Sequence, residues 1–118
     1  MNRMTVLLAI SMACASTVSM AWDAVPLKVD EGIYAFVGET GPRTVANEGM
    51  NATTGFVVTD AGVVVIDSGS SRQVAQKIEA AIRTVTDRPI RYVINTGGQD
   101  HRWLGNSHFA DLGIPLLA

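Results

Sequence analysis

A strand–helix–strand pattern in the middle of the chain constrains its fold most. The run Val63 to Ile66 is continuously apolar, a segment of helical composition follows, and Ile90 to Asn95 returns to strand composition. A crossover of this kind makes its two strands parallel and right-handed, so both strands end at the same edge of a sheet. The sequence therefore predicts an α/β layered fold. The unbroken apolar run further predicts a strand covered on both faces.

The helix between these strands is predicted from about Ser71 to Val85. Ser70 followed by Gln73 has the spacing of a capping box, and Asp87 to Pro89 end the helical pattern. One face of this helix is apolar, formed by Val74, Ile78, Ala81, Ile82 and Val85.

Shorter elements are predicted on either side of this unit. Asp60, Ala61 and Gly62 indicate a tight turn between two strands, since glycine accepts the positive φ that such a turn needs. The strands of this hairpin are Gly55 to Thr59 and Val63 to Asp67; an opening hairpin is expected from Val25 to Val29 and Gly32 to Val37, a loop over Glu39 to Asn51, a short helix over Gly105 to Leu112 and a strand at Ile114 to Ala118.

The first residues have the pattern of an export signal. Met1 to Ala21 combine a basic tip at Arg3, an apolar run and small residues at the exit, which predicts cleavage after Ala21. A membrane anchor is disfavoured because the segment contains several serines and ends without a positive flank. Lipidation at Cys14 is disfavoured because Ser11 stands where a lipobox has leucine. We therefore expect a periplasmic or secreted protein with no membrane span after cleavage.

The predicted mature chain is small and acidic. It has 97 residues, no cysteine, and eight basic residues against eleven acidic ones, for a net charge of −3. This balance argues against nucleic acid as a partner. Its length allows one domain, residues 22–118.

Two loops are expected to meet at the shared edge of the sheet. Asp67 with Ser68 and Gly69 follows the first parallel strand, and Thr96 to His101 follows the second. Ligand sites of open α/β sheets favour this edge.

These features together resemble the opening of the metallo-β-lactamase superfamily. The resemblance rests on GFVVTDAGVVVIDSG at residues 55–69, the amphipathic helix, RPIRYVINT and a later LGN. It covers about the first half of that family's αββα sandwich, so the resemblance implies a partial domain. The segment GGQDHRWLGN is also similar to exported quinoprotein relay system zinc metallohydrolases, which implies a link to quinone-dependent oxidation.

The family implies zinc, held by a His-x-His-x-Asp-His loop after a threonine. In ungapped register from Thr96, Gly97 and Gln99 stand at the first two histidines, His101 at the aspartate and Arg102 at the last histidine. If the register is shifted by one residue, Asp100 and His101 become the Asp-His pair of the motif, but no histidine stands at the two positions before them. Zinc catalysis generally needs three protein donors and a water, so hydrolysis by this chain alone is not expected.

Candidate site residues follow from this register. Gln99, Asp100 and His101 are the candidate metal ligands, and Asp67, Asp100 and His101 are candidates for loop support or proton relay. Simpler roles are a turn acid for Asp67 and an exposed loop pair for Asp100 with His101.

Neighbouring residues have simpler expected roles. Trp103 is expected to pack as a lid over the loop, and Arg102 to form a surface salt bridge with Asp100 or Asp111. His108 is expected on a helix surface.

Three functions stay open from the sequence. The first is a periplasmic metallohydrolase-family member that acts on an unknown small molecule, the second a noncatalytic module that binds an exported redox protein, and the third an unproductive fragment of a disrupted gene. A half domain would leave an apolar sheet face exposed, which also predicts self-association.

Overall fold

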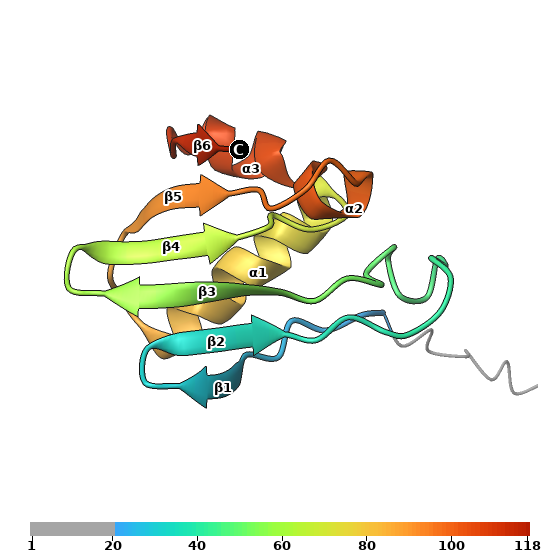
Figure 1. Cartoon of the computed structure of the whole chain (residues 1–118), viewed down its shortest axis with the longest axis horizontal. Coiled ribbons are helices and arrows are strands. Elements are labelled where there is room, and N and C mark those ends of the chain that lie inside the picture. Colours follow the sequence, from blue (N-terminus) through green and yellow to red (C-terminus); the bar gives the residue numbers. More distant parts are fainter. Residues whose placement is uncertain (1–20) are drawn as a thin grey trace, which may run out of the picture.

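The computed structural model describes residues 21–118, so the predicted export signal falls almost entirely outside the described residues. These residues form one mixed sheet in the order β1-β2-β3-β4-β5-β6 with three helices (Figure 1). Its strands are β1 (Leu27–Asp30), β2 (Ile33–Phe36), β3 (Thr54–Thr59), β4 (Gly62–Ile66), β5 (Ile90–Ile94) and β6 (Leu116–Leu117). The helices are α1 (Arg72–Val85), α2 (Asp100–Trp103) and α3 (Asn106–Asp111). Among the described residues, no helix is long and apolar enough to cross a membrane.

The predicted crossover is confirmed. β4 and β5 are parallel and α1 connects them, while β1 to β4 are joined by antiparallel pairs. The short strand β6 adds in parallel to β5. The two central strands therefore end at one edge of the sheet, as the sequence predicted.

Helix α1 buries its predicted apolar face. Val74, Ile78 and Ile82 have no exposed surface, and they pack in one core with side chains of β2 to β5. The predicted capping residue was wrong by one position, because the side chain of Ser71 accepts the hydrogen bond from the Val74 amide. The hydroxyl of Ser70 instead donates to the Glu48 carbonyl at 2.6 Å, which ties the β2–β3 loop to the helix start.

Within residues 21–118, helices cover only one face of the sheet. Figure 1 shows α1 crossing behind the sheet, with no helix in front of the central strands. Val63 and Val65 of β4 point toward α1 and are fully buried, whereas Val64 and Ile66 are only partly buried. The prediction that this strand is covered on both faces was therefore wrong for the described part of the chain.

The segment Thr96 to His101 was predicted as a loop, which is wrong for its last two residues. Asp100–Trp103 forms the one-turn helix α2, in which the Leu104 amide donates to the Asp100 carbonyl at 2.9 Å. This turn redirects the side chains that follow the Gly-Gly pair.

Candidate functional site

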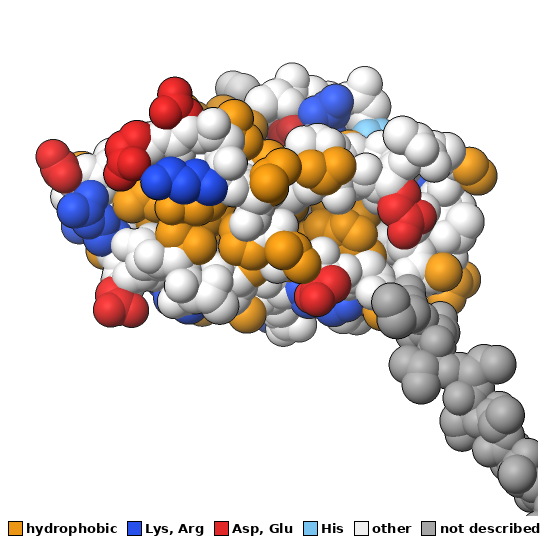
Figure 2. Space-filling model, turned by 90° about the horizontal axis from the view of Figure 1, so that it is seen from below, with side chains coloured by type: hydrophobic (Ala, Val, Ile, Leu, Met, Phe, Trp, Pro, Cys, Tyr) orange, Lys and Arg blue, Asp and Glu red, His pale blue; other side chains and the backbone are white. Residues whose placement is uncertain are grey.

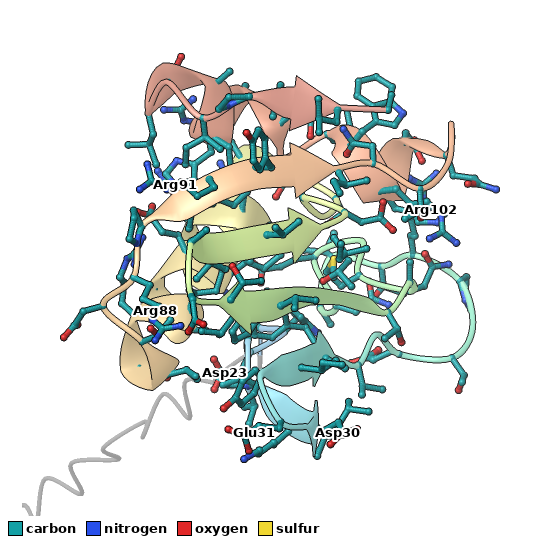
Figure 3. All side chains as sticks on the ribbon, turned by 60° about the vertical axis from the view of Figure 1, so that its left-hand side comes forward. Asp23, Asp30, Glu31, Arg88, Arg91 and Arg102 are labelled. Atoms are coloured by element: carbon teal, nitrogen blue, oxygen red, sulfur yellow. The ribbon has the colours of Figure 1, made fainter. Side chains whose placement is uncertain are left out.

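The candidate site lies at the carboxyl ends of β4 and β5. The Asp67 amide donates to the Ile94 carbonyl at 2.8 Å, which carries the parallel pairing one residue beyond the strands. Asp67 has a φ of 62°, a left-handed conformation that aspartate tolerates better than most residues. This backbone turns its carboxylate toward the loop that follows β5. Figure 3 shows Arg102 at this edge and Arg88 and Arg91 at the opposite end of the sheet.

The carboxylate of Asp67 is buried and fully engaged. Its side chain is only 2% exposed. One oxygen accepts from the Thr96 amide at 2.7 Å, and the other accepts from the Thr96 hydroxyl at 2.8 Å and from Nη1 of Arg102 at 2.9 Å. Asp67 thus has the contacts that support of the loop requires.

Arg102 is the cation of this site. Besides Asp67, its guanidinium donates to the Gln99 side chain at 3.0 Å and to the Thr96 hydroxyl at 3.2 Å. The expected surface salt bridge of Arg102 with Asp100 or Asp111 was wrong. Those two acids pair with other arginines, because the α2 turn aims Arg102 inward at the sheet edge.

Asp100 and His101 lie in the first turn of α2. An Asp100 oxygen accepts from Arg43 at 2.7 Å and from the His101 amide at 2.8 Å, and it lies 3.6 Å from Nδ1 of His101. The hydrogen bond from Arg43 is the main cause that holds the pKa of the Asp100 carboxyl below its usual value. Asp100 and Arg43 are each nearly half exposed, so solvent screens this ion pair.

The proposed metal ligands do not form a zinc site in this geometry. Gln99 is hydrogen-bonded to Arg102, and Asp100 is paired with Arg43. Within residues 21–118, no three His, Cys, Asp or Glu side chains come together in a way that could hold a metal ion. Zinc needs three or four such donors, and the guanidinium of Arg102 lies in this loop against Asp67, so the residues present do not fit this metal.

A tight junction fixes the loop beneath the site. The Ser68 amide donates to the Arg102 carbonyl at 2.8 Å, and the Ser68 hydroxyl donates to the Asn106 side chain at 2.7 Å. A Cβ at Gly105 would lie 2.1 Å from the Ser68 carbonyl oxygen, so only glycine allows this approach. No sequence pattern indicated these roles of Ser68, Asn106 or Arg43; the Gly-Asn pair at 105–106 was the available signal for the first two.

A pocket of about 460 Å³ opens beside the Gly-Gly turn. Its lining is neutral and consists of Asn95, Thr96, Gly97, Gly98, Trp103, Asn106 and Ala118. Trp103 donates from its indole nitrogen to the Gly98 carbonyl at 3.1 Å and stays 41% exposed, so it packs on the loop as expected. The side-chain oxygen of Asn95 is buried and has no hydrogen-bond partner in the described part of the chain.

His108 lies away from this site. It was expected on a helix surface, but it is 8% exposed and its Nε2 lies 2.6 Å from a Glu79 oxygen on α1. The prediction was wrong because α3 packs its inner side, including the fully buried Phe109, against α1.

Comparison with known proteins supports the fold. Residues 48–98 match the sequence model of the Metallo-beta-lactamase superfamily. This segment contains Asp67 and Thr96 and ends at Gly98, so it includes Gly97 but none of the other positions that depart from the zinc motif. No curated protein matches the chain.

Solved structures of metallo-β-lactamases are similar to this chain. The DIM-1 enzyme has a TM-score of 0.65 at 17% identity and covers 80% of this chain and 42% of its own. The enzyme from Erythrobacter litoralis has a TM-score of 0.63 at 16% identity, covering 77% and 39% respectively. A Cronobacter sakazakii metallo-β-lactamase described by its HARLDQ motif has a TM-score of 0.57 at 22% identity, covering 78% and 33%. The chain thus has part of the metallo-β-lactamase fold and spans 33–42% of the length of these proteins.

Proposed function

We propose that this chain is a partial metallo-β-lactamase-fold domain whose former metal loop is held by an arginine, and that it has little hydrolase activity of its own. The observation that carries the proposal is the contact of Arg102 with the buried Asp67 carboxylate at 2.9 Å. A guanidinium is permanently charged and supplies several fixed donors, so it can neutralise a carboxylate without a metal.

The donor chemistry supports this proposal. In the ungapped register, Gly97 has no side chain, Gln99 is a neutral oxygen donor, and Arg102 places a positive charge where the last ligand would stand. A zinc ion entering this loop would meet the Arg102 charge and would have to compete for Asp67. The loop therefore has contacts for a positively charged side chain rather than ligands for a metal ion.

A zinc titration with a matched restored variant tests the proposal. The variant Gly97→His, Gln99→His, His101→Asp and Arg102→His rebuilds the family motif. The Cβ at position 97 would approach the side chains of Gln99 and Arg102, and the same variant replaces both. We expect fewer than about 0.1 zinc per native chain and close to one per restored chain, by elemental analysis after dialysis.

The control variant Arg102→Met removes the contact of Arg102 with Asp67 but adds no metal ligand. It is expected to bind no zinc. One zinc per native chain at micromolar affinity, or turnover of a lactam or a thioester by the native chain, would refute the proposal.

The cellular setting is part of the same proposal. The signal-like start supports an exported, periplasmic protein, and the GGQDHRWLGN segment supports a link to quinoprotein-dependent oxidation with an exported redox protein as partner. Fractionation of cells that express the full chain should place it in the periplasm with a new terminus at Trp22. If the link to quinoprotein-dependent oxidation is correct, a strain that lacks this protein should grow more slowly on an alcohol that a quinoprotein oxidises.

A noncatalytic binding module is the second candidate function, and the pocket beside the loop favours it. The unpartnered Asn95 oxygen and the exposed indole of Trp103 suit a small neutral molecule with a hydrogen-bond donor and a flat apolar face. Quenching or shift of Trp103 fluorescence on titration with such compounds, absent in Trp103→Phe, tests this candidate.

A further inference from the structure

The segment before β1 is anchored in the core by an aromatic side chain. Trp22 is only 7% exposed and belongs to the same buried cluster as Phe36 and Met50. Its ring meets that of Phe36 edge-on, with the ring centroids 6.5 Å apart. A buried tryptophan removes a large apolar surface from water, so this contact holds the segment against the end of β2.

The backbone of Trp22 is held as well as its ring. Its amide donates to the Ala46 carbonyl at 3.1 Å, and its own carbonyl accepts from Nζ of Lys77 at 2.8 Å. The same Nζ donates to the Glu48 carboxylate, and the hydroxyl of Ser70 donates to the Glu48 carbonyl. Trp22 is therefore joined both to the β2–β3 loop and to α1.

Apolar character alone does not explain this anchoring. The residues that follow are also rich in apolar side chains, yet Val25, Leu27 and Val29 are 66%, 56% and 63% exposed. Figure 2, which views the molecule from the β1 side, shows hydrophobic side chains at the surface. Within residues 22–29, only Trp22 and Ala24 are buried, so the docking is specific to this point of the chain.

The anchored residue directly follows the expected cleavage site. The export signal of the proposed function ends at Ala21, so the bond to be cut joins the exposed Ala21 to the buried Trp22. In the folded chain, the N–H of this bond already donates to the Ala46 carbonyl. A peptidase has to hold the residues beside the bond in its own cleft, so it can reach this bond only after the segment has opened locally.

We infer that the bond between Ala21 and Trp22 is closed to cleavage once Trp22 has docked, so the export signal is removed before the chain folds. This inference rests on the export signal of the proposed function and adds the order of events to it. Cleavage adds water across the peptide bond, which leaves a carboxyl group on Ala21 and an amino group on Trp22. That amino group keeps a hydrogen for the Ala46 carbonyl, so docking then ties down a terminus that would otherwise be poorly ordered.

A protease probe at the same bond tests the inference on the full precursor chain. Ala21→Lys, in a Lys28→Arg background that removes the nearest other lysine, makes this bond a target of a lysine-specific endopeptidase. Both positions are exposed, so the substitutions leave the core intact. We expect cleavage after position 21 to be at least about 100-fold slower in the folded chain than in urea, because the folded chain is cut only through its opened fraction. A short peptide with the same site corrects for the effect of urea on the enzyme.

The matched control is Thr40→Lys in the same background. Thr40 lies in residues 39–46, all of which are exposed, so folding should slow cleavage after position 40 by less than about 10-fold. If folding slows cleavage after position 21 no more than cleavage after position 40, the inference is overturned.

A second variant loosens the docking without changing the cleavage site. Lys77→Met, added to the Ala21→Lys chain, removes the hydrogen bond to the Trp22 carbonyl. It should speed cleavage of the folded chain after position 21 by about 3–10-fold, the equivalent of one hydrogen bond. An unchanged rate would mean that docking of Trp22 does not control access to the bond.

Amide hydrogen exchange in the unsubstituted full chain gives a measurement that needs no variant. The Trp22 amide should exchange at least about 100-fold more slowly than in the unfolded chain, whereas the Thr40 amide should exchange close to the unfolded rate. Unprotected exchange at Trp22 would also overturn the inference. These rates are measured on the purified chain. If fractionation of cells finds no terminus at Trp22, the export part of the proposed function fails, while the rates still decide whether folding closes the bond.

Discussion

Replacing Arg102 with methionine tests whether this arginine holds the site together. The change removes the guanidinium from the buried Asp67 carboxylate and keeps an apolar stem of similar length. Breaking a fully buried ion pair costs about 3–5 kcal/mol, whereas an exposed pair contributes about 0–1 kcal/mol. Here the Asp67 side chain is 2% exposed and that of Arg102 is 31% exposed, and Thr96 still donates twice to the carboxylate. We therefore expect a loss of about 2–3 kcal/mol in the free energy of unfolding.

Urea denaturation followed by circular dichroism measures this loss, which corresponds to a fall in Tm of about 10–20 °C for a domain of this size. The control is Arg72→Met, which breaks the exposed pair with Asp111 and should cost less than about 1 kcal/mol.

A double-mutant cycle with Asp67→Asn isolates the pair itself. Asparagine tolerates the positive φ at this position and can keep the hydrogen bonds with Thr96, but its amide hydrogens would face Arg102. We expect the two losses to be coupled by about 1–2 kcal/mol. Additivity within about 0.5 kcal/mol would show that Arg102 does not act through Asp67, and the reasoning would be wrong.

Three further changes probe the surroundings of the site. Gly105→Ala should destabilise the protein by about 2–3 kcal/mol in a thermal melt because its Cβ would collide with backbone, while Gly98→Ala, which opens into free space, should stay within about 0.5 kcal/mol of the native chain. Arg43→Gln should raise the pKa of Asp100 toward its usual value in an NMR titration; because this pKa is lowered in the folded state, the pair's contribution is present above the unfolded pKa and is lost as pH falls through the folded one. An unchanged titration would contradict that pairing. Ser71→Ala should cost about 1 kcal/mol in urea denaturation by removing the helix cap, and a loss below about 0.3 kcal/mol would mean that the cap adds little.

The central unit was predictable because its signals are local. The apolar face of α1, the turn at Asp60 to Gly62 and the β-branched strands each lie within a short window, and together they fix strand order and direction. Element ends shifted by one or two residues. Only the cap moved in a way that matters, from Ser70 to Ser71, because the Ser70 hydroxyl is used by the Glu48 carbonyl.

The covering of the sheet was not predictable from periodicity. The run Val63 to Ile66 is equally apolar on both sides, so the pattern gives no information on which side α1 covers or whether anything covers the other. The structure shows that Val63 and Val65 face α1 and are buried, while Val64 and Ile66 lie on the opposite side of the strand and are only partly buried.

The position of the site was predictable, but the hydrogen-bond and ion-pair partners within it were not. Topology alone brings Asp67 to the loop after β5, and the Thr96 contacts follow from it. The partner of Arg102 depends on the one-turn helix α2, a feature of a few residues stabilised by long-range contacts such as that between Ser68 and the Arg102 carbonyl. Without this turn, the nearer acid Asp100 was the natural choice of partner.

The buried carboxylate at the sheet edge explains why an arginine matters here. A carboxylate with 2% of its side chain exposed must be compensated, since an isolated buried charge is costly. Thr96 supplies hydrogen bonds but no positive charge, so a cation is still required, and Arg102 provides it from within the chain. It follows that adding histidines at positions 97 and 99 while Arg102 remains should not create a zinc site, because the ion would have to approach a cation that already satisfies Asp67. Zinc binding should appear only when Arg102 is replaced in the same variant as positions 97 and 99.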